Sequence, residues 1–433
     1  MSSTVVVGVN WGDEGKGRIV DYLAGGADFV VRYQGGSNAG HTVVNDRGVF
    51  KLNLVPSGIF NPQAINVLGP GTVIDIEHLD RELTDLEARG VTGIKLKVSH
   101  RATICFPFHR DEDSLEEERL AANHDRPYGS TRRGIAPAYG DRALKKAIQI
   151  GELFHPEYLR ERVARLVDWK ARIATGVYGR APTATTESIM GWLEKYTKRV
   201  APMICDTSAL LGAAAKEGKR ILFEAQLGAL RDVTFGIYPF TSSSCCLASF
   251  APIGSGLFGV PADRVIGVVK AFSTCVGDGP FPTEMADKEA AQLREQANEY
   301  GAATGRPRRV GHFDVVASRY GAEVQGVTEL AVTKLDCLSG RGSLPVCTHY
   351  EYKGKPINEF PINAVLESVR PVYRELPGWD QDITAVRKFE DLPGSARDYV
   401  SFIESSIGRR IRYVSVGAHR EALIDRQGGG SAR

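Results

Sequence analysis

The sequence predicts an α/β fold: one doubly wound, mostly parallel sheet with helices on both faces and with inserted subdomains. Short runs rich in β-branched residues recur along the chain, and most are continuously apolar, which is typical of parallel strands buried on both faces. Helix-like segments lie between several of these runs, as in successive βαβ units. The expected strands cover residues 4–9, 29–33, 65–69, 94–99, 220–224, 265–273, 329–336 and 412–417, and the expected helices cover residues 76–89, 157–175 and 287–300.

Each element has its own signal. The first strand, TVVVGV, runs directly into a glycine-rich turn, and Asp75 stands where a helix starting at 76 would have its N-cap. The further runs expected to form buried strands are FVVRY, INVLG, IKLKVS, RILFE and VIGVVKAFS. ELAVTKLD and RYVSVG each end in polar or glycine residues, which is where parallel strands place ligand-binding groups.

The bulk composition excludes several classes of protein. The formal net charge of +2 gives no reason to expect a nucleic acid or an anionic membrane as partner. The seven cysteines form no CxxC pair, which argues against a zinc site or a disulfide framework and suits a reducing compartment. The chain has no signal-like N-terminus and no apolar stretch near the ~20 residues of a membrane helix. We therefore expect a cytoplasmic protein.

The 433 residues would allow several domains, but no composition break marks a boundary. We expect one elaborated domain over residues 1–425, followed by a flexible glycine-rich tail at 426–433.

Residues 8–18, GVNWGDEGKGR, are similar to a Walker A loop of the P-loop NTPase-like folds. A strand precedes the turn at 12–17, Lys16 occupies the lysine position and a helix can follow. Asn10 replaces the first glycine, and Gly17 replaces the hydroxyl that binds Mg²⁺. Asp13 inside the loop could supply the missing oxygen ligand, and it would repel phosphates unless a cation or a catalytic task offset its charge.

TKLD at 333–336 is a candidate for reading guanine. Asp336 can accept from the N1–H and the exocyclic amino group of the base together, while the stem of Lys334 covers the base face. Adenine has no such donor pair, so the combination with the Lys16 loop favours GTP over ATP. The SVG run at 415–417 could close over the base.

Three further loops carry polar residues suited to small ligands. RYQGGSNAGHT at 32–42 contains Asn38 and His41 among glycines that permit close approach, and YGSTRRGIAPAY at 128–139 offers hydroxyls for a phosphate. GAATGRPRR at 301–309 is either a solvated charged surface or a braced pair of guanidinium forks for a small dicarboxylate. GTP, a second phosphorylated ligand and an acidic small molecule together indicate a GTP-driven ligase.

With these motifs assembled, the chain closely resembles the adenylosuccinate synthetase family. The matching segments are WGDEGKG, RYQGGSNAGHT, GIAPAY, FEAQLG, GPFPTE, GAATGRPRR, TKLD and PGWDQD, which span residues 4 to about 420. The resemblance implies a homodimer that joins L-aspartate to inosine 5′-monophosphate (IMP), using GTP and Mg²⁺. It implies that a base removes the N1 proton of IMP, so that the 6-oxygen attacks the γ-phosphate and forms a 6-phosphoryl intermediate.

The resemblance also implies a role for individual residues. Asp13 would be the base and His41 would stabilise charge developing on the 6-oxygen and the γ-phosphoryl group, and Asp13 with the Gly40 carbonyl would hold the metal. GTP would be bound by Gly12, Gly15, Lys16, Gly17, Gly40, Thr42, Lys334, Asp336, Ser415 and Gly417, IMP by Asn38, Thr131, Lys145, Gln226 and Ser242, and aspartate by Thr304, Arg306 and Arg308.

Several positions depart from the family pattern. The glutamine of FEAQLG is displaced by one position, Cys275 replaces an arginine, and Lys145 replaces the arginine that reaches the IMP phosphate of the partner subunit. Thr241 and Ser242 compete as ligands of the 5′-phosphate. Because these changes gather around the nucleotide monophosphate, a modified purine nucleotide is an alternative acceptor. A regulatory GTP-binding protein is a further alternative, disfavoured by the two glycine loops and the arginine cluster.

Overall fold

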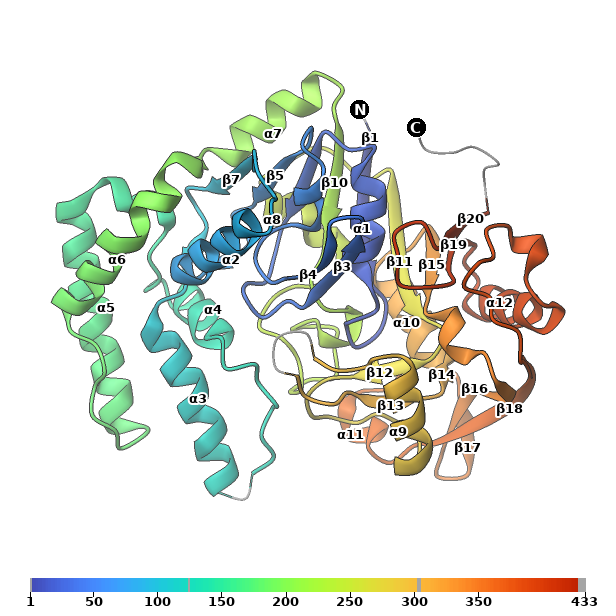
Figure 1. Ribbon diagram of the computed structural model, residues 1–433. Coiled ribbons are helices and arrows are strands. Elements are labelled where there is room, and N and C mark those ends of the chain that lie inside the picture. Colours follow the sequence, from blue (N-terminus) through green and yellow to red (C-terminus); the bar gives the residue numbers. More distant parts are fainter. Residues whose placement is uncertain (1, 124, 302–304, 427–433) are drawn as a thin grey trace.

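A ten-stranded sheet forms the centre of the protein, as a computed structural model describes it for residues 2–123, 125–301 and 305–426 (Figure 1). All of its strand pairs are parallel except the one at the β20 edge. Its strands, in spatial order, are β20 (Leu423–Asp425), β19 (Ile411–Ser415), β15 (Glu329–Thr333), β11 (Arg264–Lys270), β1 (Ser2–Gly8), β10 (Arg220–Glu224), β2 (Phe29–Arg32), β5 (Ile65–Leu68), β7 (Leu96–Ser99) and β9 (Ile204–Cys205).

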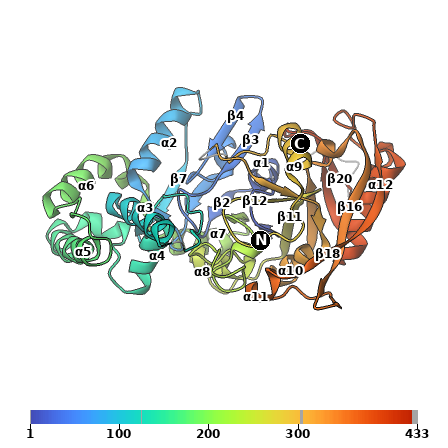
Figure 2. The same cartoon turned by 90° about the horizontal axis from the view of Figure 1, so that it is seen from below.

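The predicted mostly parallel, doubly wound sheet is confirmed, since all eight expected strands lie in it. Val6 belongs to a core cluster on one face, while Val5 and Val7 belong to a cluster on the other, which explains the continuously apolar runs. Figure 2 shows helices on opposite faces of the sheet. One face carries α1 (Lys16–Ala24) and α2 (Ile76–Ala88), and the other carries α7 (Thr207–Lys216), α8 (Ala251–Ser255) and α10 (Val315–Val324).

Inserted elements extend the two ends of the sheet (Figures 1 and 2). At one end lie α3 (Pro107–Ala122), α4 (Ile135–Ala143), α5 (Pro156–Gly176) and α6 (Thr186–Val200). At the other end lie β14 (Phe313–Asp314), β16 (Arg341–Tyr352), β17 (Lys355–Ile357), α11 (Asn363–Leu366), β18 (Arg370–Trp379) and α12 (Gly394–Ile407). The remaining strands and helix are β3 (His41–Asn45), β4 (Gly48–Leu52), β6 (Val73–Ile74), β8 (Thr103–Ile104), β12 (Ser273–Cys275), β13 (Arg309–Gly311) and α9 (Asp287–Gln296).

Expected boundaries differ from the observed ones where the backbone turns left-handed. The run at 329–336 ends as a strand at Thr333, because Lys334 has φ of 59° and a 3₁₀ turn follows. The helix expected at 287–300 ends at Gln296, shortly before Asn298 with φ of 48°. The run at 265–273 divides between β11 and β12. The tail at 427–433 lies outside the described residues.

The parallel sheet brings the candidate loops together. β1, β2, β10, β15 and β19 all point the same way, so their carboxyl ends lie along one edge. The Lys16 loop, the glycine loop with His41, the FEAQLG segment, the TKLD motif and the SVG motif follow these strands in turn. Among the described residues, none of the helices is both long and apolar enough to cross a membrane.

Gly321 in α10 allows this helix to pack directly against the start of the Lys16 loop. A Cβ at Gly321 of α10 would lie 1.8 Å from the carbonyl oxygen of Val9, and Asn10 donates to the Ser318 hydroxyl at 3.0 Å. We expect Gly321→Ala to lower the free energy of unfolding by about 1–3 kcal/mol and to raise the KM of GTP, because α10 and the loop must separate.

The matched control for this prediction is Gly191→Ala in α6, where the added Cβ meets nothing within 4 Å. It should be neutral or slightly stabilising. Chemical denaturation and GTP kinetics measure both variants, and wild-type stability in Gly321→Ala would contradict the prediction.

Candidate active site

The turn after β1 has the backbone geometry of a phosphate-binding loop. Gly12, Asp13 and Gly15 have left-handed φ values of 100°, 58° and 96°, and α1 begins immediately with Lys16. Successive N–H groups at such a turn and at a helix N-terminus form an anion-binding cradle. The backbone therefore has the form that the predicted phosphate site requires.

Gly17, which stands where a Walker A loop carries a hydroxyl, lies against His41. A Cβ at Gly17 would lie 2.8 Å from the Cβ of His41 and 3.1 Å from the hydroxyl oxygen of Ser57. A side chain at this position would therefore displace the histidine. The absence of a hydroxyl side chain at position 17 therefore leaves the space that His41 occupies.

Glu14 braces the loop from within, a role that motif reading did not assign. Its buried carboxylate accepts from the N–H groups of Asn10 at 3.1 Å and Gly12 at 2.8 Å, and Nζ of Lys16 lies 2.7 Å away. These contacts hold the turn in its left-handed course. The sequence feature that could have indicated this role is the position of Glu14, an acidic residue two positions before Lys16.

His41 pairs with a buried carboxylate at the end of β10. Nδ1 of His41 hydrogen-bonds Glu224, which also accepts from the Ser57 N–H at 2.8 Å and the Ser57 hydroxyl at 2.6 Å. Burial lowers the pKa of His41, and Glu224 opposes that shift. Burial disfavours ionisation of Glu224, but His41, Arg32 and Ser57 together hold its pKa below the ordinary value. The sequence analysis did not assign a role to Glu224, although it is the second residue of the FEAQLG segment.

Asn38 and Gln226 form a second fixed pair. The Gln226 side-chain oxygen accepts from Arg32 at 2.7 Å and from the Gly36 N–H at 3.0 Å, while its amide nitrogen donates to Asn38. A Cβ at Gly35, whose φ is +80°, would lie 1.7 Å from the same oxygen. Gly35 thus allows the Gln226 side chain to lie against the backbone of this loop, while the predicted approach of a ligand to the loop stays a prediction.

A cavity of about 590 Å³ brings many of the predicted residues together. Loops from the first, second and tenth strands and from the α3–α4 region line it, so residues far apart in sequence share one space. The predicted site residues in its wall are Gly12, Asp13, Lys16, Asn38, Gly40, His41, Thr131, Gln226, Thr241 and Ser242.

The predicted guanine-reading residues lie beside the loop, at the end of β15. The Thr333 hydroxyl donates to the Glu14 carbonyl at 2.6 Å, which ties β15 to the loop. Oδ1 of Asp336 is buried and has no hydrogen-bond partner within the described ranges, so an acceptor is available for a ligand. Burial raises the pKa of Asp336. Ser415 accepts from Arg18 and lies 3.3 Å from the Gly417 carbonyl.

Arg308 connects Asp13 to a buried acid that the sequence did not single out. Nε of Arg308 lies 3.0 Å from Oδ2 of Asp13, and its Nη1 lies 2.6 Å from Oε2 of Glu299. Lys334 also lies 3.0 Å from Glu299. The predicted base, the predicted aspartate site and the predicted guanine site are therefore joined by one chain of charged groups.

Other predicted residues lie apart from the cavity. Lys145 is exposed beyond the end of α4 with φ of 62°, Thr42 is exposed on β3, and Arg306 is exposed before β13. Thr304 lies outside the described residues.

Arg231 supplies a guanidinium where Cys275 replaces the arginine of the family pattern. It lies 3.0 Å from the Cys275 sulfur and donates to the carbonyls of Val276 at 2.6 Å, Asp278 at 3.1 Å and Phe240. The two loops that it joins, at 238–243 and 276–278, both contribute residues to the cavity wall. The pairing spans 44 residues, and local motif reading had no signal for it.

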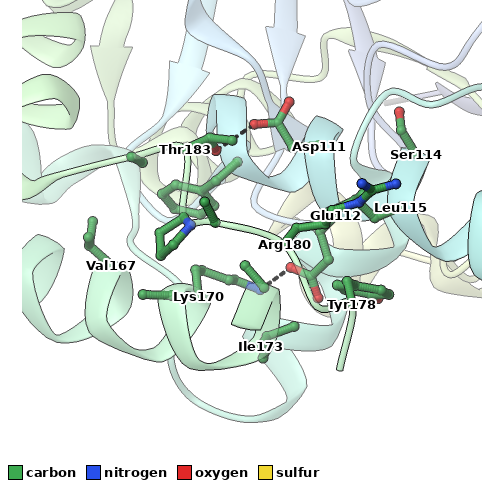
Figure 3. Close-up of a pocket in the computed structure, with 16 residues that line it drawn as sticks. Asp111, Glu112, Ser114, Leu115, Val167, Lys170, Ile173, Tyr178, Arg180 and Thr183 are labelled. Carbon is green, nitrogen blue, oxygen red and sulfur yellow. Dashed lines mark hydrogen bonds and ion pairs between the residues drawn. The ribbon is translucent and has the colours of Figure 1, made fainter. Parts of the chain in front are cut away.

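A second cavity, of about 380 Å³, lies between α3, α5 and residues 178–184 (Figure 3). Its wall is mostly aliphatic and aromatic. Lys170 and Glu112 form an ion pair at 2.7 Å, and Thr183 donates to Asp111 at 2.8 Å. It holds no predicted site residue, so the larger cavity is the candidate for the chemistry.

Comparison with known proteins agrees with this architecture. A family model described as adenylosuccinate synthetase matches residues 5–424. Adenylosuccinate synthetase 2 of Pseudoalteromonas translucida is 49% identical over 98% of this chain and 100% of its own length. The structure of fully ligated adenylosuccinate synthetase from Plasmodium falciparum has a TM-score of 0.92 at 31% identity, covering 99% of this chain and 100% of that one. Succinoaminodeoxyadenylate synthetase of cyanophage S-2L shares the fold, with a TM-score of 0.61 at 18% identity over 98% of this chain and 95% of that one.

Proposed function

The chain belongs to the adenylosuccinate synthetase family, and we propose from that premise which of its residues carry out each step. The reaction ligates L-aspartate to IMP and yields adenylosuccinate, GDP and phosphate in purine biosynthesis. The observation that carries the assignment is the presence of Asp13 and His41 in one cavity with Asn38, Thr131 and Gln226.

Asp13 is the proposed base for the first step. The 6-oxygen of hypoxanthine is a poor nucleophile while N1 keeps its proton. Transfer of that proton to the Asp13 carboxylate makes the oxygen anionic, and it then forms a bond to the γ-phosphorus. The bond between that phosphorus and the bridging oxygen breaks, and GDP leaves.

The second step uses the 6-phosphoryl group as a leaving group. The amine of aspartate attacks C6, phosphate departs with the C6–O bond electrons, and the amine loses a proton. His41, oriented by Glu224, donates to the developing charge on the 6-oxygen and the γ-phosphoryl group. Lys16 and the N–H groups of the loop neutralise the transferring phosphates.

The donor set near the loop fits Mg²⁺ bound through nucleotide phosphates. No group of three or more His, Cys, Asp or Glu side chains within the described ranges could hold a metal alone. Asp13 and the Gly40 carbonyl border the cavity, and Mg²⁺ in nucleotide sites usually takes one or two carboxylates with phosphate oxygens. The ion would supply positive charge to the phosphates.

The remaining proposed contacts divide among the three substrates. GTP is held by the 12–17 loop, Gly40, Thr42, Lys334, Asp336, Ser415 and Gly417; IMP by Asn38, Thr131, Gln226 and Thr241 or Ser242; and aspartate by Thr304, Arg306 and Arg308.

A homodimer is part of the proposal. Lys145 is exposed and does not line its own cavity, so a second copy in which it reaches the IMP phosphate of the neighbouring subunit would give it a ligand. We also propose a cytoplasmic location and one elaborated domain.

The product from IMP, aspartate and GTP tests the function directly. A mass spectrum should show adenylosuccinate, and phosphate release should require both IMP and aspartate. A panel of purine monophosphates tests the modified-nucleotide alternative, since faster turnover of another member would favour it. Equal phosphate release from GTP alone would favour a regulatory GTP-binding protein.

Asp336→Asn should convert the nucleotide preference from GTP to xanthosine triphosphate. Asparagine can accept from N1–H but presents a donor to the 2-amino group, whereas the 2-oxygen of xanthine accepts that donor. We expect kcat/KM for GTP to fall about 100-fold and that for xanthosine triphosphate to rise, because a site built for a polar pair rejects its mismatch. Steady-state kinetics with both nucleotides measure this, with the KM of IMP as internal control. Retained preference for GTP would contradict the assignment.

A further inference from the structure

Glu299 is a fully buried carboxylate that holds three cations. Its Oε1 lies 3.0 Å from Nζ of Lys334, and its Oε2 lies 2.7 Å from Nζ of Lys270 and 2.6 Å from Nη1 of Arg308. Lys270 also donates to the Thr274 hydroxyl at 2.6 Å. The two oxygens of one carboxylate thus divide their contacts between different parts of the site.

The backbone of Glu299 also contacts the segment that carries Arg306 and Arg308. Its carbonyl accepts from the Arg308 N–H at 2.9 Å, and Tyr300 pairs with Pro307 as an isolated β-bridge. Glu299 therefore stands at the base of the loop that presents Arg306 and Arg308. A shift of the Glu299 carboxylate would therefore move its contacts with Arg308 and with Lys334 together.

We propose that Glu299 is a positioning residue that couples the GTP site to the aspartate site. The inference rests on the proposed assignment of Lys334 to guanine and Arg308 to aspartate. Ordering of Lys334 by a bound guanine fixes the Glu299 carboxylate between Lys334 and Arg308. The carboxylate in turn fixes the guanidinium of Arg308 for the incoming aspartate. By thermodynamic reciprocity, aspartate strengthens the binding of GTP by the same factor.

Glu299→Gln is the main test, with the KM of each substrate measured at several fixed concentrations of the others. In the wild type, we expect the KM of aspartate to fall several-fold as GTP approaches saturation. In the variant, the KM values of GTP and aspartate should each rise about tenfold, that dependence should disappear, and the KM of IMP should change less than about twofold.

The matched control is Glu284→Gln. Glu284 pairs with Arg309 at 2.8 Å, one residue along from Arg308, but it is exposed. It should leave all three KM values and the coupling unchanged. Glu299→Asp provides a second variant that keeps the buried charge but withdraws it by one methylene, and it should show the same split between substrates with smaller increases.

Two further variants separate this inference from the site assignment. If Lys334→Met raises the KM of GTP and Arg308→Leu raises that of aspartate, while both Glu299 variants behave as wild type, the coupling role is overturned and the assignment stands. If Lys334→Met and Arg308→Leu have no effect, the assignment itself fails. A wild-type aspartate KM that does not depend on GTP, or an equal rise for IMP in Glu299→Gln, would also overturn the coupling role.

Discussion

Asp13→Asn is expected to lower kcat about 10³-fold while the affinity for GTP changes little. Asparagine has the size of aspartate and tolerates the left-handed φ of 58°, so the loop should keep its course. Its amide oxygen can still coordinate Mg²⁺ in place of the carboxylate, so the proposed metal site should keep its ligand. It cannot take the N1 proton, and removal of a general base in a positioned site costs about 10²–10⁴-fold. The proton transfer is the proposed first step, so both single-turnover phosphate release and adenylosuccinate formation should fall together.

Glu116→Gln is the control for a lost carboxylate in the same cavity. Glu116 lines that cavity and pairs with Arg119 at 2.8 Å on its own helix, without contact to the loop. It should keep turnover within about twofold, because removal of a partly exposed surface ion pair has little effect. Near-normal turnover in Asp13→Asn, with GTP binding intact by a fluorescent-nucleotide titration, would remove Asp13 from the base role.

The central sheet could be predicted from the sequence because its signal is local. A parallel strand buried on both faces is continuously apolar, so each of the eight runs identified its own strand without knowledge of its neighbours. The sheet of β14 and β16–β18 gave no such signal. β16 is partly exposed along its length and carries Pro345, and its register with β18 shifts between Cys347 and His349, so neither a continuously apolar run nor a regular alternation marks it.

The residues of the candidate site likewise fall into two groups, those that a short motif predicts and those that only the folded structure identifies. Glycine loops and the TKLD motif have short-range patterns with a chemical meaning, and the fold collects most of them at one cavity or beside it. Glu224 and Arg231 act on partners 183 and 44 residues away, so only the folded chain shows what each of them contacts. Glu299 was equally invisible, because an acid in a polar segment usually faces solvent.

Glu224→Gln should lower kcat about 10²–10³-fold and shift the activity profile toward acid, because the carboxylate orients His41 and favours its protonated form. Glu224 raises the pKa of His41, while burial and the nearby Arg32 and Lys16 lower it. Removing the negative charge leaves only the lowering effects. If the protonated ring donates to the reacting oxygens, the fall in activity at high pH must begin at a lower pH in the variant.

Ser57→Ala distinguishes this electrostatic role from simple packing. It removes the hydroxyl that donates to Glu224 at 2.6 Å but keeps the carboxylate charge and its contact with His41. Its kcat should fall much less, and the high-pH limb of its profile should stay near that of the wild type. An unshifted limb in Glu224→Gln, or the same shift in Ser57→Ala, would mean that Glu224 does not set the protonation of His41. A reduced kcat with an unshifted limb would instead assign the carboxylate to orientation alone, since orientation by itself moves the rate and leaves the titration where it was.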